Sequence, residues 1–217
     1  MVSHARLRES IPEYRTSASH ETEDRYGPFL FDQIEDTTQD LIGRGPVELD
    51  NGAIYHGNWT KEGLRQGKGS QYWPSGFFFQ GYWNQDMATG KGRLINPNGS
   101  MYQGEWKDDL AHGFGEYFSM AGANYRGLWH CDRQHGKGTE IWPDKCSYEG
   151  NFLNGLKQGT GVFTFSDGAI YDGSLKRGDI HGHGTYVWPD GRRYVGQWKE
   201  NRMHGKGEFT WSDNRRY

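Results

Sequence analysis

Residues 171–198 read YDGSLKRGDIHGHGTYVWPDGRRYVGQW, and the Tyr-x-Gly start at 171 returns 23 residues later at 194. The same start runs through most of the 217-residue chain, with one spacing of 24 residues. The ring column comprises Tyr55, Phe79, Tyr102, Tyr125, Tyr148, Tyr171, Tyr194 and Tyr217, and the glycine column comprises Gly57, Gly81, Gly104, Gly127, Gly150, Gly173 and Gly196. Self-similarity at a fixed period of this length predicts a repeat protein.

Each repeat has the pattern of a β-hairpin. Apolar and glycine positions alternate with polar ones in stretches such as 102–106, which is typical of a strand with one buried face. A Gly-x-Gly pair opens the second strand, as at 182–184, and dipeptides such as Asp167-Gly168 make the reverse turns. Because glycine has no Cβ, it lets the neighbouring rings lie flat on the backbone.

One hairpin is marginally stable alone, so neighbouring hairpins must stack into a shared sheet. The sequence therefore predicts an all-β fold, an elongated single-layer antiparallel sheet of stacked hairpins over residues 41–217. This array contains a half unit followed by seven units. The pattern ends on Tyr217, the first residue of a further unit. We expect either that the array continues or that this open strand edge pairs with a partner or a second copy.

The repeat resembles a known family. Y-x-G-x-W, a spacer, H-G-x-G, an aromatic stretch and D/N-G at a 23-residue period resemble the MORN (membrane occupation and recognition nexus) repeat over residues 41–217. Phe152 and Leu175 replace the usual Trp, Lys145 stands at a turn glycine, and the last turn reads Asp213-Asn214. The resemblance implies stacked hairpins and cytoskeletal settings, notably ciliary axonemes with radial-spoke proteins and the basal or cortical structures of protists.

The first 40 residues carry none of the pattern. Residues 1–25 are polar and mixed in charge, and we expect a flexible tail. Residues 26–40 turn apolar, and we expect them to cap the first strand of the array, since repeat arrays need atypical ends. A partner-binding peptide is the alternative interpretation of residues 26–40.

The composition excludes several classes of protein. Leu, Ile, Val and Phe make up only 35 residues, but the net charge is −3, aromatic residues reach 15% and glycine supplies 33 positions, which favours rings packed on glycine over disorder. The sequence has no apolar stretch of about 18 residues and no secretory signal pattern. Cys131 and Cys146 fit reduced thiols. We expect a cytoplasmic protein, in the cytoskeleton or a cilium.

The sequence predicts no enzyme, no cofactor and no metal. In several repeats a histidine precedes the Gly-x-Gly pair and could be considered as a metal ligand. Histidines of neighbouring repeats lie about 10 Å apart, however, which is too far for two ligands that must each lie about 2 Å from one zinc ion. Gln66, Thr89 and Gln158 occupy the position that histidine holds in other repeats, which favours a turn hydrogen bond over metal binding. Gly-Lys-Gly stretches lack the spacing and the strand-to-helix setting of a phosphate loop. The histidines before the Gly-x-Gly pairs are His112, His135, His181 and His204.

The charge of the array bears on whether it binds nucleic acids or anionic lipids. Residues 46–217 carry 20 Lys or Arg and 19 Asp or Glu, far from the basic footprint that nucleic acids require. Anionic lipid headgroups usually need about 4–8 basic residues on one surface. Only the C-terminal end approaches this number, with Arg192, Arg193, Lys199, Arg202, Lys206, Arg215 and Arg216.

The preferred hypothesis is a non-enzymatic scaffold that docks partner proteins along the β-repeat array. The alternative hypothesis is a membrane-associated adaptor that recognises anionic phospholipids through its basic C-terminal repeats. We expect partner peptides to bind in a groove lined by central rings of the array, namely Tyr102, Trp106, Tyr125, Trp129, Tyr148 and Tyr171.

Overall fold

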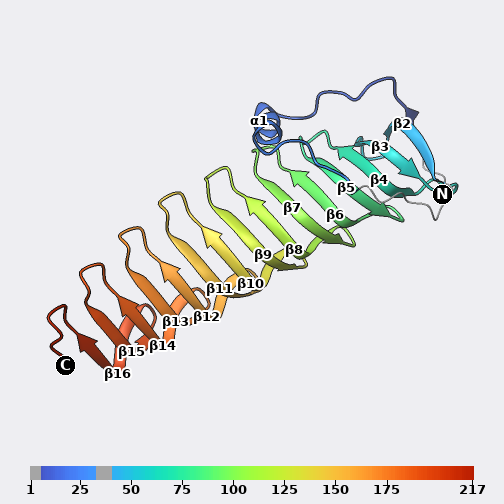
Figure 1. The fold of residues 1–217 in the computed structure, drawn as a ribbon. Coiled ribbons are helices and arrows are strands. Elements are labelled where there is room, and N and C mark those ends of the chain that lie inside the picture. The colour runs from blue at the N-terminus through green and yellow to red at the C-terminus, as the bar shows by residue number, and fades with distance from the viewer. Residues whose placement is uncertain (1–5, 33–40) are drawn as a thin grey trace. The chain divides into compact units, whose positions relative to one another are not determined.

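The computed structural model describes residues 6–32 and 41–217. The chain contains two compact units, Met1–Met120 and Ala121–Tyr217. Within each unit the strands follow one another in sequence order and pair antiparallel, so that consecutive hairpins lie side by side (Figure 1). The predicted all-β fold of stacked hairpins is confirmed.

In the first unit, residues 6–32 and 41–120 form one helix and the strands of the first repeats. β2 begins one residue after the predicted start of the array and supplies its half unit, and β1 pairs with β2. The elements are β1 (Arg6–Leu7), α1 (Ser17–Tyr26), β2 (Ile42–Glu48), β3 (Ile54–Trp59), β4 (Arg65–Tyr72), β5 (Phe78–Asn84), β6 (Met87–Ile95), β7 (Met101–Lys107) and β8 (Leu110–Phe118).

The second unit contains four hairpins. Each first strand carries the ring and glycine columns, and each second strand carries the Gly-x-Gly pair. The strands are β9 (Asn124–His130), β10 (Arg133–Ile141), β11 (Ser147–Leu153), β12 (Leu156–Thr164), β13 (Ile170–Lys176), β14 (Asp179–Val187), β15 (Arg193–Lys199) and β16 (Arg202–Thr210). The last residues fold back on β16, where the backbones of Tyr217 and Phe209 exchange two hydrogen bonds of 2.9 Å.

Glycines face one another across the strands, and each ring of the column lies over such a pair. In the second unit Gly138 opposes Gly127 on one side and Gly150 on the other. A Cβ on Gly127 would lie 2.6 Å from Oη of Tyr125, and a Cβ on Gly138 would lie 2.6 Å from Cε2 of the same ring. The glycine rows are therefore required by the rings, as the sequence predicts.

Most hairpins turn through two residues with positive φ, which matches the right-handed twist of the flanking strands. Asp108 and Asp109 join β7 to β8 with φ of 51° and 66°, and Arg177 and Gly178 join β13 to β14 with φ of 55° and 93°. The wider turns between hairpins also contain a residue with positive φ. Lys145 fills that position after β10 with φ of 70°.

The structure differs from the sequence in the N-terminal region, where we expected a flexible tail over residues 1–25. Residues 17–26 form α1, whose N-cap Thr16 accepts a hydrogen bond from the Ser19 amide at 3.1 Å. Thr16 Oγ1 also donates to the Pro97 carbonyl at 2.6 Å, and Thr22 Oγ1 donates to the Gly99 carbonyl at 2.6 Å. These bonds hold α1 against the turn between β6 and β7 (Figure 1).

The predicted cap also lies elsewhere than expected. Tyr26 packs on Phe118 with ring centroids 4.5 Å apart, and Lys91 pairs with Asp32 at 3.0 Å, so residues 26–32 contact strands well beyond the first one. Residues 33–40 of the predicted cap lie outside the described residues. In the part of the chain that the structure describes, no helix has the length and apolar character needed to cross a membrane.

Candidate partner-binding surface

Each unit's sheet has two faces, and the register assigns the columns to one of them. Tyr171 of β13 opposes Phe163 of β12 and Tyr186 of β14, so rings of first and second strands share one face. We call the face that carries the ring column the aromatic face of its unit. Residues at the intervening positions, such as Val162 and Ile170, point to the opposite face because strand side chains alternate.

Five of the six rings predicted to line a groove are buried. Tyr125, Tyr148 and Tyr171 are at most 2% exposed, Tyr102 and Trp106 are under 9% exposed, and Trp129 is half-buried. These rings therefore form the core on which the glycines pack. Their direct role in partner binding stays a prediction.

The buried tyrosines are fixed by one repeated hydrogen bond. Each hydroxyl donates to the carbonyl three residues later, for example from Tyr171 to Ser174 at 2.8 Å and from Tyr102 to Glu105 at 2.9 Å. Burial raises the pKa of Tyr148 and of Tyr171 to about 12, and it also raises the pKa of Tyr125. The hydroxyls thus stay protonated and act as structural donors.

The accessible rings of the second unit do not belong to the ring column of the first strands. They lie on the second strands and on the turns that follow them. Neighbouring ring centroids are 4.6 to 6.3 Å apart along a continuous series, and every ring in it is half-buried. We call this series the ring ladder; it comprises Trp142, Phe163, Phe165, Tyr186, Trp188, Phe209 and Trp211. Sequence reasoning did not select these residues, although all seven recur at the same 23-residue period.

An ion pair lies at the Trp142 end of the ring ladder. Lys157 Nζ lies 2.5 Å from Glu140 Oε2, and the two side chains are 17% and 19% exposed. The Lys157 ammonium also lies 4.7 Å from the ring centroid of Trp142 and 5.9 Å from that of Phe163. The charge is therefore neutralised by a carboxylate and surrounded by ring faces that attract cations.

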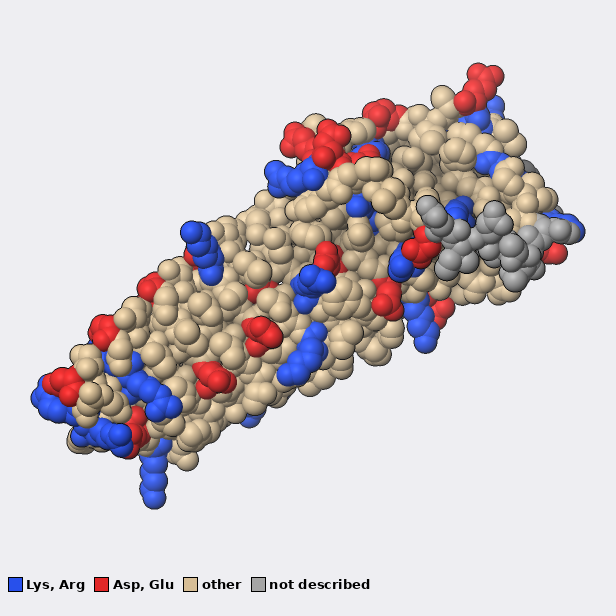
Figure 2. All heavy atoms as spheres, in the orientation of Figure 1, with Lys and Arg blue, Asp and Glu red and all other residues tan. Residues whose placement is uncertain are grey.

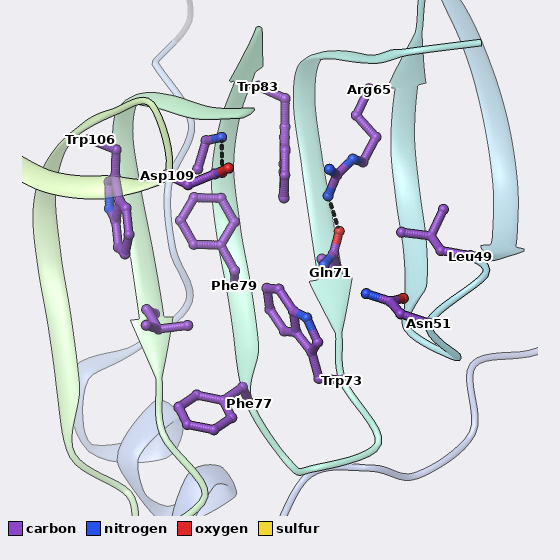
Figure 3. A pocket seen from close by; sticks show the side chains of 12 residues that line it. Leu49, Asn51, Arg65, Gln71, Trp73, Phe77, Phe79, Trp83, Trp106 and Asp109 are labelled. Carbon is purple, nitrogen blue, oxygen red and sulfur yellow. Dashed lines mark hydrogen bonds between the residues drawn. The ribbon is translucent and has the colours of Figure 1, made fainter. Parts of the chain in front are cut away.

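The first unit has a pocket of about 390 Å³ on its aromatic face (Figure 3). Arg65 lies 4.2 Å from the Trp83 ring centroid, donates from Nε to Asp86 Oδ1 at 3.0 Å and also hydrogen-bonds Gln71. These bonds hold the Arg65 side chain against the wall of the pocket. The aromatic residues that line the pocket are Trp73, Phe77, Phe79, Trp83 and Trp106.

The basic residues of the lipid hypothesis lie among acidic partners. Arg192 pairs with Asp190 at 2.7 Å, Arg215 pairs with Asp213 at 2.7 Å, and Arg216 lies 3.8 Å from Glu208. Figure 2 shows basic and acidic side chains intermixed at the C-terminal end. Strand alternation divides the set, because Arg193, Lys199, Arg202 and Lys206 belong to the opposite face. Phospholipid binding stays a prediction.

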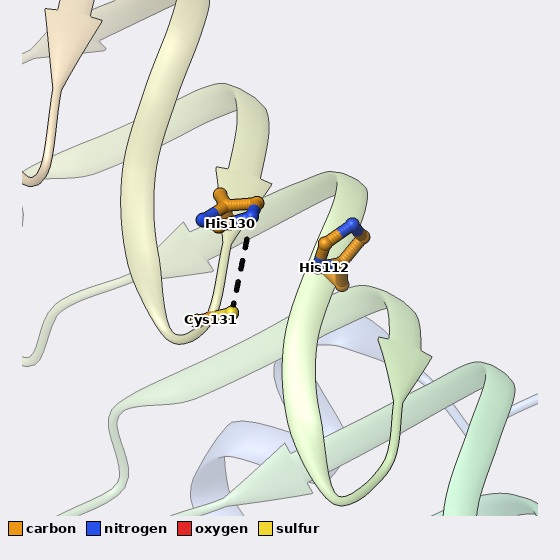
Figure 4. Close-up of side chains that lie close together, drawn as sticks. All are labelled: His112, His130 and Cys131. Carbon is orange, nitrogen blue, oxygen red and sulfur yellow. Dashed lines mark hydrogen bonds between the residues drawn. The ribbon is translucent and has the colours of Figure 1, made fainter.

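In two repeats glutamine occupies the histidine position before the Gly-x-Gly pair, and its side chain forms a hydrogen bond with the backbone of a hairpin turn. Gln66 and Gln158 accept hydrogen bonds from the backbone amides of Gln85 and Arg177 at 2.9 and 3.0 Å. At the turn after β9, Cys131 Sγ lies 4.0 Å from His130 Nε2 (Figure 4).

Comparisons with solved structures gave likenesses at low identity. The TCP domain of SAS-4 from Drosophila melanogaster, solved with a proline-rich motif of Ana2, is 11% identical, with 88% of this chain and 96% of that chain covered and a TM-score of 0.45. The TCP10 domain of CPAP from Danio rerio, solved with a STIL peptide, is 13% identical, with 82% and 92% covered and a TM-score of 0.27. A search of curated proteins found no match.

The scan against family models gave a match over most of the chain. The MORN repeat model matches seven segments, residues 55–77, 79–101, 102–120, 125–147, 148–170, 171–192 and 194–214. These segments coincide with the hairpins that carry the ring and glycine columns. The chain therefore belongs to the MORN repeat family.

Proposed function

We propose that the chain is a non-enzymatic scaffold that binds segments of partner proteins on the aromatic faces of its units. The observation that carries this proposal is the accessible aromatic lining on that face of each unit, with a pocket in the first and the ring ladder in the second. Aromatic residues are enriched at the cores of protein interfaces, because they bury a large area at a small cost in side-chain entropy. The resemblance to MORN proteins points to a cytoskeletal or ciliary assembly.

The experiment compares two variants of the full chain as baits in cell extract with chemical cross-linking. Trp188→Ala removes a ring of the ladder, and Val162→Ala removes a side chain of the opposite face that is 37% exposed. We expect Trp188→Ala to lose the cross-linked partners that Val162→Ala retains. Equal partner recovery by both variants, with both folded by circular dichroism, would exclude the aromatic face.

The lipid alternative is tested in parallel with liposomes that contain anionic phospholipid. The double variant Arg192→Glu/Arg193→Glu reverses two charges of the basic C-terminal end. We expect its partner recovery to equal that of the unchanged chain. If the unchanged chain sediments with liposomes and the double variant does not, the lipid hypothesis replaces the scaffold hypothesis.

A further inference from the structure

We propose that the ring ladder of the second unit binds a proline-rich partner segment in the polyproline II conformation, running across the strands. This inference rests on the proposed function and names the class of segment that one of its surfaces accepts. The argument uses the spacing of the rings, their exposure and the charges beside them.

The spacing follows from the sheet. Equivalent rings such as Phe165 and Trp188 directly follow the alternate strands β12 and β14, so they recur roughly every 9.6 Å across the sheet. A polyproline II helix rises about 3.1 Å per residue with three residues per turn, so one of its edges recurs about every 9.3 Å. Residues i, i+3 and i+6 of such a segment therefore meet successive repeats of the ladder.

Other peptide conformations match this spacing less well. An extended strand repeats its side chains every roughly 6.6–6.8 Å, which falls out of register after one repeat. An α-helix repeats one face over seven residues, about 10.5 Å, and over three repeats it drifts by about 3 Å from the rings. A polyproline II segment drifts by about 1 Å over the same three repeats.

The charges beside the ladder favour an uncharged segment. Lys157 is paired with Glu140, Arg192 with Asp190 and Arg215 with Asp213. These bases are neutralised within the unit. They lie 4.7 to 5.8 Å from the ring centroids of Trp142, Trp188 and Trp211, and the remaining rings of the ladder are half-buried between them. Proline matches such a surface, since it is uncharged and its ring packs on aromatic faces, and its segments lose little entropy on docking.

The indole rings add a polar contact of the required kind. Trp142, Trp188 and Trp211 each carry an N–H that can only donate. A polyproline II segment exposes backbone carbonyls and has no internal hydrogen bonds, so its carbonyls are available to such donors. Recognition of proline-rich segments in aromatic-lined surfaces combines these two contacts.

The test uses two labelled 13-residue peptides, each with nine prolines and four leucines. One carries leucine at positions 2, 5, 8 and 11, and the other carries it at positions 1, 5, 9 and 13. Fluorescence anisotropy with the full chain measures the dissociation constants. We expect the peptide with leucine at every third residue to bind at least about tenfold more tightly. Equal affinities, or tighter binding of an amphipathic helical peptide of the same length, would overturn the proposal.

Variants locate the site on the ladder. Trp188→Ala should weaken the better peptide about tenfold, and Val162→Ala on the opposite face should leave its affinity unchanged. Equal binding by a folded Trp188→Ala would overturn the assignment to the ladder. If neither peptide binds while cross-linked partners are still lost in Trp188→Ala, the polyproline proposal fails and the proposed function stands.

Discussion

At the scale of single residues, the packing of tyrosine on glycine determines which substitutions a repeat can accept. A Cβ on Gly115 would lie 2.6 Å from Cζ and from Cε2 of Tyr102, whereas a Cβ on Gly45 would have no heavy atom within 4 Å. Tyr102 is held by its hydrogen bond to Glu105 and is 6% exposed. The ring therefore has no space into which it could move.

Gly115→Ala should lower the free energy of unfolding of the first unit by at least about 2 kcal/mol, because the added methyl group overpacks the core. Gly45→Ala introduces the same methyl group into open space and serves as the matched control. Urea unfolding followed by circular dichroism measures both variants. Similar stabilities for the two variants would contradict the close contact.

The buried tyrosines make the free energy of unfolding of the second unit depend on pH in the alkaline range. Tyr148 and Tyr171 have pKa values raised to about 12 by burial, against about 10 in an unfolded chain. The folded state favours the protonated form, so this stabilisation is complete below about pH 10 and is lost as the pH rises from about 10 to about 12.

We therefore expect the free energy of unfolding to fall less steeply above pH 10 in the double variant Tyr148→Phe/Tyr171→Phe than in the unchanged chain. Tyr217→Phe, at a ring that is 91% exposed, is the control and should keep the original slope. Urea titrations at pH 9, 10, 11 and 12 measure these slopes. The same slope in all three proteins would contradict the burial of the two hydroxyls.

The sequence predicts the core contacts well and the accessible surface poorly. The period places Tyr171 above its glycines, because only glycine tolerates a ring in flat contact. The same period recurs at Tyr186, and periodicity alone does not separate a buried ring from an accessible one. That difference arises from the glycine rows. The first-strand rings contact the backbone of the glycines directly and are buried, whereas the rings of the second strands remain half-buried.

At the scale of the elements, turn geometry determines the cost of replacing a turn glycine by another residue. Lys145 adopts φ of 70° at a position where equivalent turns have glycine, such as Gly168 and Gly191. Left-handed backbone costs a residue with a Cβ about 1–2 kcal/mol. The hairpin still forms, so this departure is tolerated at a local cost in stability.

Lys145→Gly should raise the stability of the second unit by about 1 kcal/mol. Lys137→Gly, within β10, removes the same side chain from a strand and should lower the stability by about 0.5–1 kcal/mol. Thermal unfolding measures both variants. A lower melting temperature for Lys145→Gly would show that the turn conformation is not what limits this hairpin.

The position of α1 could not be predicted from hydrophobic pattern, because its sequence SASHETEDRY is polar and its contacts are hydrogen bonds to turn carbonyls. A local signal was present nonetheless. Thr16 is a typical N-cap and Gly27 follows the last helical residue. The two residues predict a helix but not the strands that it contacts.

Thr16→Ala should weaken the start of α1 by about 1 kcal/mol, since it removes the cap and the bond to Pro97 together. We expect the amides of residues 17–26 to exchange hydrogen about fivefold faster by mass spectrometry. Ser10→Ala, at an exposed serine, is the control. Unchanged exchange in Thr16→Ala would contradict the role of this residue in anchoring the helix.

At the scale of the whole molecule, the two units differ in which faces of their sheets are buried. The second unit has its core rings and its accessible rings on the aromatic face, whereas the first unit also buries Phe78, Ile95 and Met101 on the opposite face. In the first unit, residues 12–32 contact the opposite face, where Phe78 is 2% exposed beneath Arg15 at 4.4 Å. In the second unit, equivalent positions such as Ile170 are exposed. The two faces of the second unit can therefore be compared directly as candidate binding surfaces.

The most direct measurement of the central claim is photo-cross-linking in cells with benzoylphenylalanine introduced at Trp188 or at Ile170. Trp188 belongs to the ring ladder, and Ile170 is 42% exposed on the opposite face. We predict that the Trp188 position forms covalent adducts with partner proteins and that the Ile170 position does not. Protein adducts from Ile170 alone, or lipid adducts alone from both positions, would contradict partner binding on the aromatic face.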